Sequence, residues 1–379
     1  MALGLSWTSV LLLILIILLS IAIMGLFSFK NHLPVEGRTV LITGASQGMG
    51  KSAACQISSR GANVIIVARD TKKLAAALTE IKAAAKNPTT QRFLSISADV
   101  TLASENTRIL AESTAWNNGF PPDIVWQIAG ASKPTLLLDS SLDTMHAQMD
   151  LNYWAAVYLA RETMTAWLAA SSCPQSSQSS SSSSSSAAEP LPRHIILTTS
   201  IAAMLGVAGY APYCPAKAAM RSFADAMRSE LNLYNGARRQ ADAHRDPAYP
   251  PPPTEMHIHL VVPGTIDSPG LQLENESKHD ITNMIEEVDP VQHPDAVARG
   301  AIRGLEGGQY IVIPHWFNRF MAGSSWQGSP RSSMLVDTVL GLVTGVAWLF
   351  VGPDLERQVW NYGKRWGLKG RPKGHKGWT

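Results

Sequence analysis

The feature that most constrains the fold is a glycine-rich turn between a short apolar strand and a helical segment. The run TGASQGMG occupies positions 43–50, directly after a β-branched stretch. Gly44 permits a tight turn, Gly48 lets the backbone approach a pyrophosphate, and Gly50 lets helix and strand pack closely. A P-loop is excluded because its spacing requires glycine where the chain has Ala45. The turn therefore predicts a dinucleotide-binding unit.

Short β-branched runs alternate with helical stretches along the chain. This alternation is typical of parallel sheets whose crossovers are helices. We therefore predict an α/β fold: one Rossmann-type doubly wound parallel sheet with helices on both faces. The six expected strands are Thr39–Ile42, Asn63–Ala68, Phe93–Ala98, Ile124–Ile128, His194–Thr199 and Ile258–Val262.

Composition narrows the class of protein. The 379 residues are 45% hydrophobic, which is enough for a large core, and the net charge of +3 is too small for a nucleic-acid surface. The cysteines Cys55, Cys173 and Cys214 are odd in number and match no metal-ligand spacing, so we expect no metal site. A reducing, cytosol-facing compartment fits them best.

The N-terminus predicts a membrane anchor over residues 1–30. Val10–Phe27 is uncharged and almost wholly apolar, and its 18 residues would reach about 27 Å as a helix. A cleavable signal peptide is the alternative, but no basic residue precedes the run. Because Lys30 and Arg38 follow it, we expect the catalytic domain on the cytosolic side.

A second apolar stretch, Met334–Val351, opens the C-terminal part of the chain, residues 331–379. Asp337 near its start leaves a short uncharged remainder, so a re-entrant segment, an interfacial helix and a core helix all remain open. Gly341 and Gly345 have a spacing that allows close helix approach in lipid. The tail that follows is basic and aromatic, which suits an anionic membrane surface or a solvated tail.

Between these ends we expect one catalytic domain, residues 36–320. Two polar insertions interrupt it, a serine-rich one at 174–190 and a proline-rich one at 240–254. Both lack apolar residues to bury, so they are expected to be surface loops without chemistry.

The end of the second expected strand predicts which dinucleotide binds. NAD-binding units place a carboxylate there for the ribose 2′-hydroxyl, but this strand ends Ala68-Arg69-Asp70. The Arg69 guanidinium suits a 2′-phosphate, with Lys73 and Lys51 as helpers, so NADPH is favoured. Asp70 could instead serve the ribose or cap the next helix.

The third expected strand is followed by Asp99 and Val100. These residues are placed to reach the adenine, although Asp99 could equally cap a helix.

Tyr213 and Lys217 form the central chemical motif. Four residues apart on a helix, they share one face, and the lysine charge can stabilise a phenolate. Ser200, at the end of a strand thirteen residues upstream, can hydrogen-bond a substrate carbonyl while the tyrosine transfers its proton. The set predicts reduction of a carbonyl by hydride.

Together these motifs resemble the short-chain dehydrogenase/reductase family. The family's Thr-Gly-x3-Gly-x-Gly turn is matched at 43–50, and its Asn-x-Ala-Gly strand end by Ala129 and Gly130, with Gln127 in place of the asparagine. The resemblance implies that Asn152 holds a water that relays protons to the lysine. It also implies that the loop Pro263-Gly264-Thr265 wraps the nicotinamide.

The expected catalytic residues are therefore Asn152, Ser200, Tyr213 and Lys217. The expected cofactor-binding residues are Gly44, Ser46, Gln47, Gly48, Gly50, Arg69, Lys73, Asp99, Val100, Ala129, Gly130, Tyr213, Lys217, Pro263, Gly264 and Thr265.

Within that family the chain is similar to the reductases of 3-ketodihydrosphingosine, a long-chain keto-base lipid. The apolar segments at both ends, the run at 264–270 and the Glu-Asn-x-x-Lys segment at 274–278 carry this similarity. It implies NADPH-dependent reduction in sphingolipid synthesis, at the endoplasmic reticulum membrane, by a chain that can form a homodimer. The alternatives are a reductase of another lipid carbonyl, such as a 3-ketoacyl-CoA, a steroid or retinal, and a catalytically silent dinucleotide-binding scaffold.

Overall fold

The protein is described from a computed structural model, in which residues 30–169, 190–239, 251–326 and 329–366 can be described. The expected anchor Val10–Phe27, nearly all of the serine-rich insertion, most of the proline-rich insertion and the tail beyond residue 366 lie outside these ranges.

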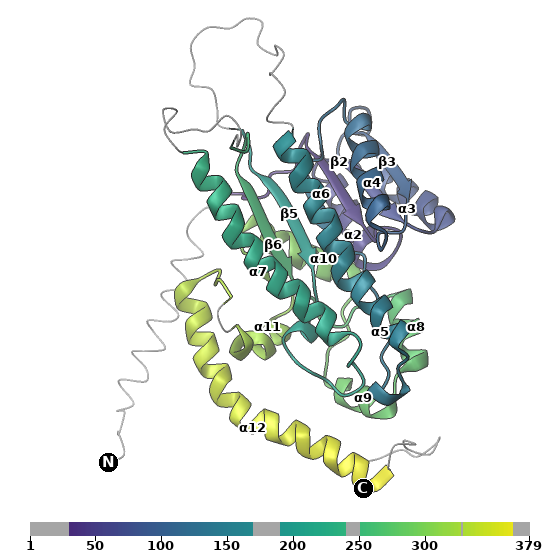
Figure 1. Ribbon diagram of the computed structural model, residues 1–379, viewed down its shortest axis with the longest axis vertical. Coiled ribbons are helices and arrows are strands. Elements are labelled where there is room, and N and C mark those ends of the chain that lie inside the picture. The colour runs from purple at the N-terminus through teal and green to yellow at the C-terminus, as the bar shows by residue number, and fades with distance from the viewer. Residues whose placement is uncertain (1–29, 170–189, 240–250, 327–328, 367–379) are drawn as a thin grey trace, which may run out of the picture.

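A parallel sheet of seven strands forms the centre of the described chain, in the order β3-β2-β1-β4-β5-β6-β7 (Figure 1). Crossovers run outward in both directions from β1, which is the doubly wound arrangement that the sequence predicts. The strands are β1 (Thr39–Thr43), β2 (Asn63–Ala68), β3 (Phe93–Ser97), β4 (Ile124–Gln127), β5 (Arg193–Thr198), β6 (Met256–Val261) and β7 (Ile311–Val312).

The sequence predicts six of these strands to within two residues at each end, because the central ones are buried on both faces and read as apolar runs. The prediction of only six strands is wrong. The seventh, Ile311–Val312, pairs with β6 through Leu260 and Val261, and two residues are too few to show a pattern.

Helices cover both faces of the sheet. One apolar core lies between the sheet and helices α2, α3 and α10, and two more lie between the other face and α4, α6 and α7. The helices are α2 (Gly48–Ser58), α3 (Thr71–Ala83), α4 (Ala103–Trp116), α5 (Leu142–Met149), α6 (Ala155–Ala169), α7 (Cys214–Ala237), α8 (Pro269–Ser277), α9 (Asp280–Glu286), α10 (Pro294–Glu306), α11 (Trp316–Ala322) and α12 (Met334–Trp366).

The expected C-terminal apolar stretch is the first half of α12, one long helix that runs along the edge of the molecule beyond α9 (Figure 1). Its segment Met334–Tyr362 has a mean hydropathy of 2.0 over its most apolar window, of which only 11% is buried. By length and composition this segment could cross a membrane. The core-helix interpretation is wrong, because most of its apolar side chains face outward.

The inner side of α12 is fixed to the domain by polar contacts. The carboxylate of Asp337 is fully buried, pairs with Arg319 at 2.9 Å and accepts the backbone N–H of Ser333 at 2.8 Å. The Trp348 indole donates to the Met321 carbonyl at 3.3 Å. Asp337 therefore faces protein rather than lipid, so it does not shorten the apolar surface of the helix.

Of the two glycines Gly341 and Gly345, only the first packs closely against another part of the described chain. A Cβ on Gly341 would lie 3.3 Å from the carbonyl oxygen of Gly323, whereas a Cβ on Gly345 would meet nothing within 4 Å. Gly341 thus serves packing against the domain.

Candidate active site

A cavity of about 1090 Å³ lies at the carboxyl ends of the strands. Its walls come from the glycine turn, the ends of β2, β4, β5 and β6, the region around α8 and α9, and the middle of α12. Every residue of the expected catalytic and cofactor-binding sets except Asn152 lines it, whereas the expected helper Lys51 does not. Clefts outside the carboxyl ends of parallel strands are where doubly wound sheets bind ligands.

The glycine turn packs backbone against backbone. Gly44 has a φ of +69°, and a Cβ there would lie 2.7 Å from the backbone of Ala129. A Cβ on Gly50 would lie 2.2 Å from the carbonyl oxygen of Gly44. No side chain caps the N-terminus of α2, so its first N–H groups face the cavity beside Ser46 and Gln47 and can hold a phosphate. These residues fit a dinucleotide.

Arg69 and Lys73 line the outer end of the same cavity. The Lys73 ammonium lies 3.3 Å from the Gln47 side-chain oxygen. Asp70 caps α3, accepting the backbone N–H groups of Lys72 and Lys73, and these hydrogen bonds lower the pKa of its carboxyl. Of the two roles expected for Asp70, the helix cap is therefore the one that the structure shows.

The sequence also predicts Lys51 and Asp99 at this end of the cavity. Lys51 pairs with Glu80 at 2.8 Å and does not line the cavity, so its expected role as a helper is wrong. Asp99 accepts from the backbone and hydroxyl of Thr101 at 3.0 and 2.8 Å while lining the cavity with Val100. It caps a turn, since α4 begins only at Ala103.

Gln127 stands where the resembled family has asparagine, at the end of β4. Its amide donates to the Ala129 carbonyl at 2.7 Å, while its side-chain oxygen is buried without a hydrogen-bond partner. The hydroxyl of Thr43 accepts the backbone N–H groups of Ile128 and Ala129, each at 3.3 Å. Thr43 therefore holds the end of β4 beside the glycine turn.

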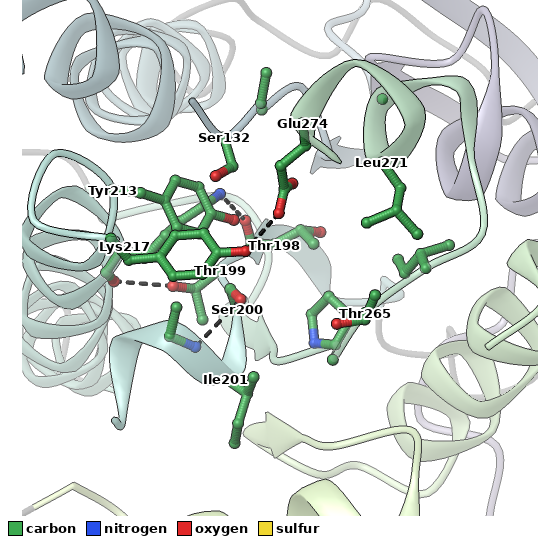
Figure 2. Close-up of a pocket in the computed structure, with 18 of the residues that line it drawn as sticks. Ser132, Thr198, Thr199, Ser200, Ile201, Tyr213, Lys217, Thr265, Leu271 and Glu274 are labelled. Carbon is green, nitrogen blue, oxygen red and sulfur yellow. Dashed lines mark hydrogen bonds between the residues drawn. The ribbon is translucent and has the colours of Figure 1, made fainter. Parts of the chain in front are cut away.

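Ser200, Tyr213 and Lys217 converge at the inner end of the cavity (Figure 2). Ser200 follows β5 and accepts the backbone N–H of Ala202 at 3.2 Å. Tyr213 precedes the first turn of α7, and Lys217 lies one turn into that helix. The Lys217 ammonium donates to the Thr198 carbonyl at 3.1 Å and lies 5.7 Å from the centre of the Tyr213 ring.

Burial dominates the electrostatics of this group. It raises the pKa of Tyr213 above its usual value, although a hydrogen bond with Ser200 opposes the shift. It also lowers the pKa of Lys217 to about 7. The expected lowering of the tyrosine pKa by the lysine charge is not seen in this arrangement, and Tyr213 is protonated, as a proton donor must be.

Asn152 lies just behind the cavity wall, in a π-helical turn (Asp150–Trp154) between α5 and α6. It is fully buried, and its amide donates to the Ala131 carbonyl at 2.9 Å. A Cβ on Gly130 would lie 2.9 Å from the Asn152 side-chain oxygen and 3.1 Å from the Lys217 nitrogen. A side chain at position 130 would therefore press on the ends of both side chains. The proton-relaying water expected beside Asn152 stays a prediction.

The loop Pro263-Gly264-Thr265 follows β6 and lines the cavity. The Thr265 hydroxyl donates to Asp289 at 2.6 Å, and a Cβ on Gly264 would lie 2.4 Å from the Asn318 side chain. The backbone of the loop at Gly264 thus packs closely against the Asn318 side chain.

Sequence reasoning missed one polar group in this cavity. Tyr210, Glu274 and Glu286 line it, and the Tyr210 hydroxyl lies within hydrogen-bond distance of both carboxylates and can donate to either. Lys278 joins the two carboxylates from behind. The Glu-Asn-x-x-Lys segment is the signal that could have identified it, since it places Glu274 and Lys278 one helical turn apart.

Comparison with known proteins agrees with this geometry. A family model described as short chain dehydrogenase matches residues 38–179. A 3-ketodihydrosphingosine reductase of Neurospora crassa is 41% identical over 93% of this chain and 89% of its own length. One of Aspergillus fumigatus is 42% identical over 91% and 89%, and one of Cryptococcus neoformans is 29% identical over 84% and 82%.

Solved structures with the same fold are more distant in sequence. A short-chain type dehydrogenase/reductase from Mycobacterium ulcerans has a TM-score of 0.55 at 20% identity, covering 74% of this chain and 89% of its own. One from Burkholderia phymatum, in complex with NAD, has a TM-score of 0.57 at 15% identity, covering 75% and 90%. The chain belongs to the short-chain dehydrogenase/reductase family, and its cavity is a nicotinamide dinucleotide site.

The position of Tyr213 generates a direct prediction. Tyr213→Phe keeps the ring but removes the proton donor, so ketone reduction should fall by about 10²- to 10⁴-fold while dinucleotide affinity changes little. The checks are steady-state kinetics and dinucleotide titration by fluorescence. Tyr234→Phe, on the same helix but outside the cavity, is the matched control and should keep full turnover. Unchanged turnover in Tyr213→Phe would contradict the role of proton donor.

Proposed function

We propose that the protein uses NADPH to reduce 3-ketodihydrosphingosine to dihydrosphingosine, a step of sphingolipid synthesis. The observation that carries the proposal is the convergence of Ser200, Tyr213 and Lys217 in the same cavity as the glycine turn. Relatives named 3-ketodihydrosphingosine reductase, matched over nearly their whole length, support the choice of substrate.

The mechanism follows from the positions of the side chains. When bound, the reduced nicotinamide supplies the hydride. The Ser200 hydroxyl orients the carbonyl oxygen of the substrate and the protonated Tyr213 donates the proton to it. Lys217, held by the Thr198 carbonyl, adds positive charge beside the ring as the phenolate forms. Asn152 holds the loop end at Ala131 and orders the water that returns the proton.

NADPH, rather than NADH, is proposed from the charge at the outer end of the cavity. Arg69 and Lys73 line it, and the carboxylate of the neighbouring Asp70 accepts backbone N–H groups at the start of α3. Two cations at this end favour a 2′-phosphate over a 2′-hydroxyl.

We also propose that α12 lies flat in the membrane surface. One end is tied to the domain by Asp337 and Arg319, and the other by the ring contact of Tyr362 with His279. A helix with both ends on one domain cannot deliver them to opposite sides of a bilayer. Its outward leucines Leu335, Leu342 and Leu349 are 68–70% exposed and seven residues apart, so they form one stripe.

The inner side of α12 meets the cavity, which Trp348, Leu355 and Val359 help to line. A substrate with a long alkyl tail can therefore pass from the lipid to Tyr213 along one helix. The proposed compartment is the endoplasmic reticulum membrane with the catalytic domain in the cytosol, to be checked by microscopy and protease protection of the tagged chain.

The substrate proposal is tested with the detergent-solubilised protein. We expect NADPH oxidation with 3-ketodihydrosphingosine to exceed that with a 3-ketoacyl-CoA, a ketosteroid or retinal at matched concentrations, and NADH to serve poorly. Activity only on another carbonyl would move the substrate while keeping the chemistry. No activity on any of the four would support the silent scaffold instead.

The membrane proposal is tested by depth measurement in lipid vesicles. An environment-sensitive fluorescent amino acid replaces Leu335, Leu342 or Leu349 in turn, and lipids carrying quenchers at different depths report its position. A flat helix places all three at one shallow depth. A spanning helix would separate the outer two by about 21 Å, because each residue rises 1.5 Å, and such a gradient would contradict the proposal.

A further inference from the structure

The polar group beside the catalytic tyrosine holds more negative than positive charge. The Lys278 ammonium contacts Glu274 at 2.9 Å and Glu286 at 2.5 Å, and the Tyr210 hydroxyl lies between the two carboxylates, with one proton that it can donate to either. Burial and the two glutamates raise the pKa of Tyr210, so it stays neutral. Two carboxylates and one ammonium leave a net charge of −1, and we call these four residues the glutamate cluster.

Among the described residues, Lys278 is the one cation that forms an ion pair with the carboxylates of the glutamate cluster. Lys217 is engaged by the Thr198 carbonyl, and Asp289, which also lines the cavity, is a further anion that accepts from Thr265. The cations Arg69 and Lys73 line the cavity at the end of β2, beside the glycine turn. An uncompensated charge in a partly buried wall is costly, so a cation entering here is stabilised.

The cluster faces the reacting centre rather than the outer surface. The side chains of Glu274 and Glu286 are only 16% and 21% exposed, and that of Lys278 is 2% exposed. Figure 2 shows the Glu274 carboxylate pointing to the ring hydroxyl with which it is hydrogen-bonded, on the side of the cavity where Tyr213 lies. The Tyr210 and Tyr213 rings lie 5.8 Å apart, and the charge of Glu274 is felt at the Tyr213 hydroxyl.

The proposed substrate carries a primary amine on the carbon next to its ketone. We propose that Glu274, supported by Glu286, binds this ammonium group and so makes the site specific for 2-amino ketones. This inference rests on the proposed function and deepens it. It also gives the Glu-Asn-x-x-Lys segment a role, because that segment supplies both Glu274 and Lys278.

The arrangement explains how one contact can select and position the substrate. With the ammonium held at Glu274, the adjacent carbonyl is within one carbon of the anchored group and is directed to Ser200 and Tyr213. A ketone that lacks the amine leaves the cluster charge uncompensated, so it loses the contact and keeps the desolvation cost. Binding of the cation also offsets the negative charge that opposes formation of the Tyr213 phenolate.

The test compares two substrates with two variants of the full-length protein. The substrates are 3-ketodihydrosphingosine and the same hydroxyketone without the amine. In Glu274→Gln, we expect the preference for the amino ketone over the deaminated ketone to fall roughly 10- to 100-fold. The main cause should be a higher KM for the amino ketone, because the variant loses a hydrogen bond between charged groups. The deaminated ketone should be reduced as well as before or better.

Glu276→Gln is the matched control. It makes the same change two residues along α8, on an exposed side chain that does not line the cavity, and should keep the wild-type preference. If Glu274→Gln does not fold, inhibition of the unmodified protein decides: dodecylamine should compete with substrate at least tenfold more strongly than dodecanol.

The outcomes separate this inference from the proposed function. If Glu274→Gln loses the same fraction of its activity on both ketones, the cluster only supports the fold around α8 and α9, and the inference is overturned. A wild-type protein that reduces both ketones equally would also overturn it while leaving the reductase in place. Reduction of neither ketone, with dinucleotide still bound, would instead refute the proposed function.

Discussion

The close approach of two backbones, where β1 and β4 end, is the constraint on which the rest of the site depends. Gly44 lies against Ala129, and Gly50 lies against Gly44, at distances that leave no room for a Cβ. This contact opens the N-terminus of α2 to the cavity. Next to Ala129, Gly130 lies against the ends of the Asn152 and Lys217 side chains, so a Cβ there would press on both. The cofactor-binding turn and the catalytic residues thus lie close together because glycines at these positions carry no side chain.

Much of this arrangement could be predicted from the sequence, because the motifs are local. The turn at 43–50, the strand ends and the Tyr213–Lys217 spacing each depend on a few neighbouring residues, and the sheet then brings them to one edge. Three features depend on contacts distant in the chain and were missed or misjudged. The strand β7 is too short to show a pattern, Lys51 is taken by Glu80, and Asp337 is buried against Arg319.

Burial sets the chemistry of the cavity more than any single ion pair. It keeps Tyr213 protonated, as a proton donor to a carbonyl must be, and it lowers the pKa of Lys217 to about 7. The same cavity runs from α12, whose outer side is apolar, to the glutamate cluster beside Tyr213. A ligand that is apolar at one end and cationic beside its ketone matches both ends of this path.

The most direct measurement is the structure of the protein with NADP⁺ and dihydrosphingosine bound together. The account predicts the 3-hydroxyl oxygen within hydrogen-bond distance of Ser200 and Tyr213, the amine at Glu274, and the alkyl chain along the inner side of α12. A complex with the hydroxyl away from Tyr213, or with the alkyl chain in place of the amine at Glu274, would contradict it.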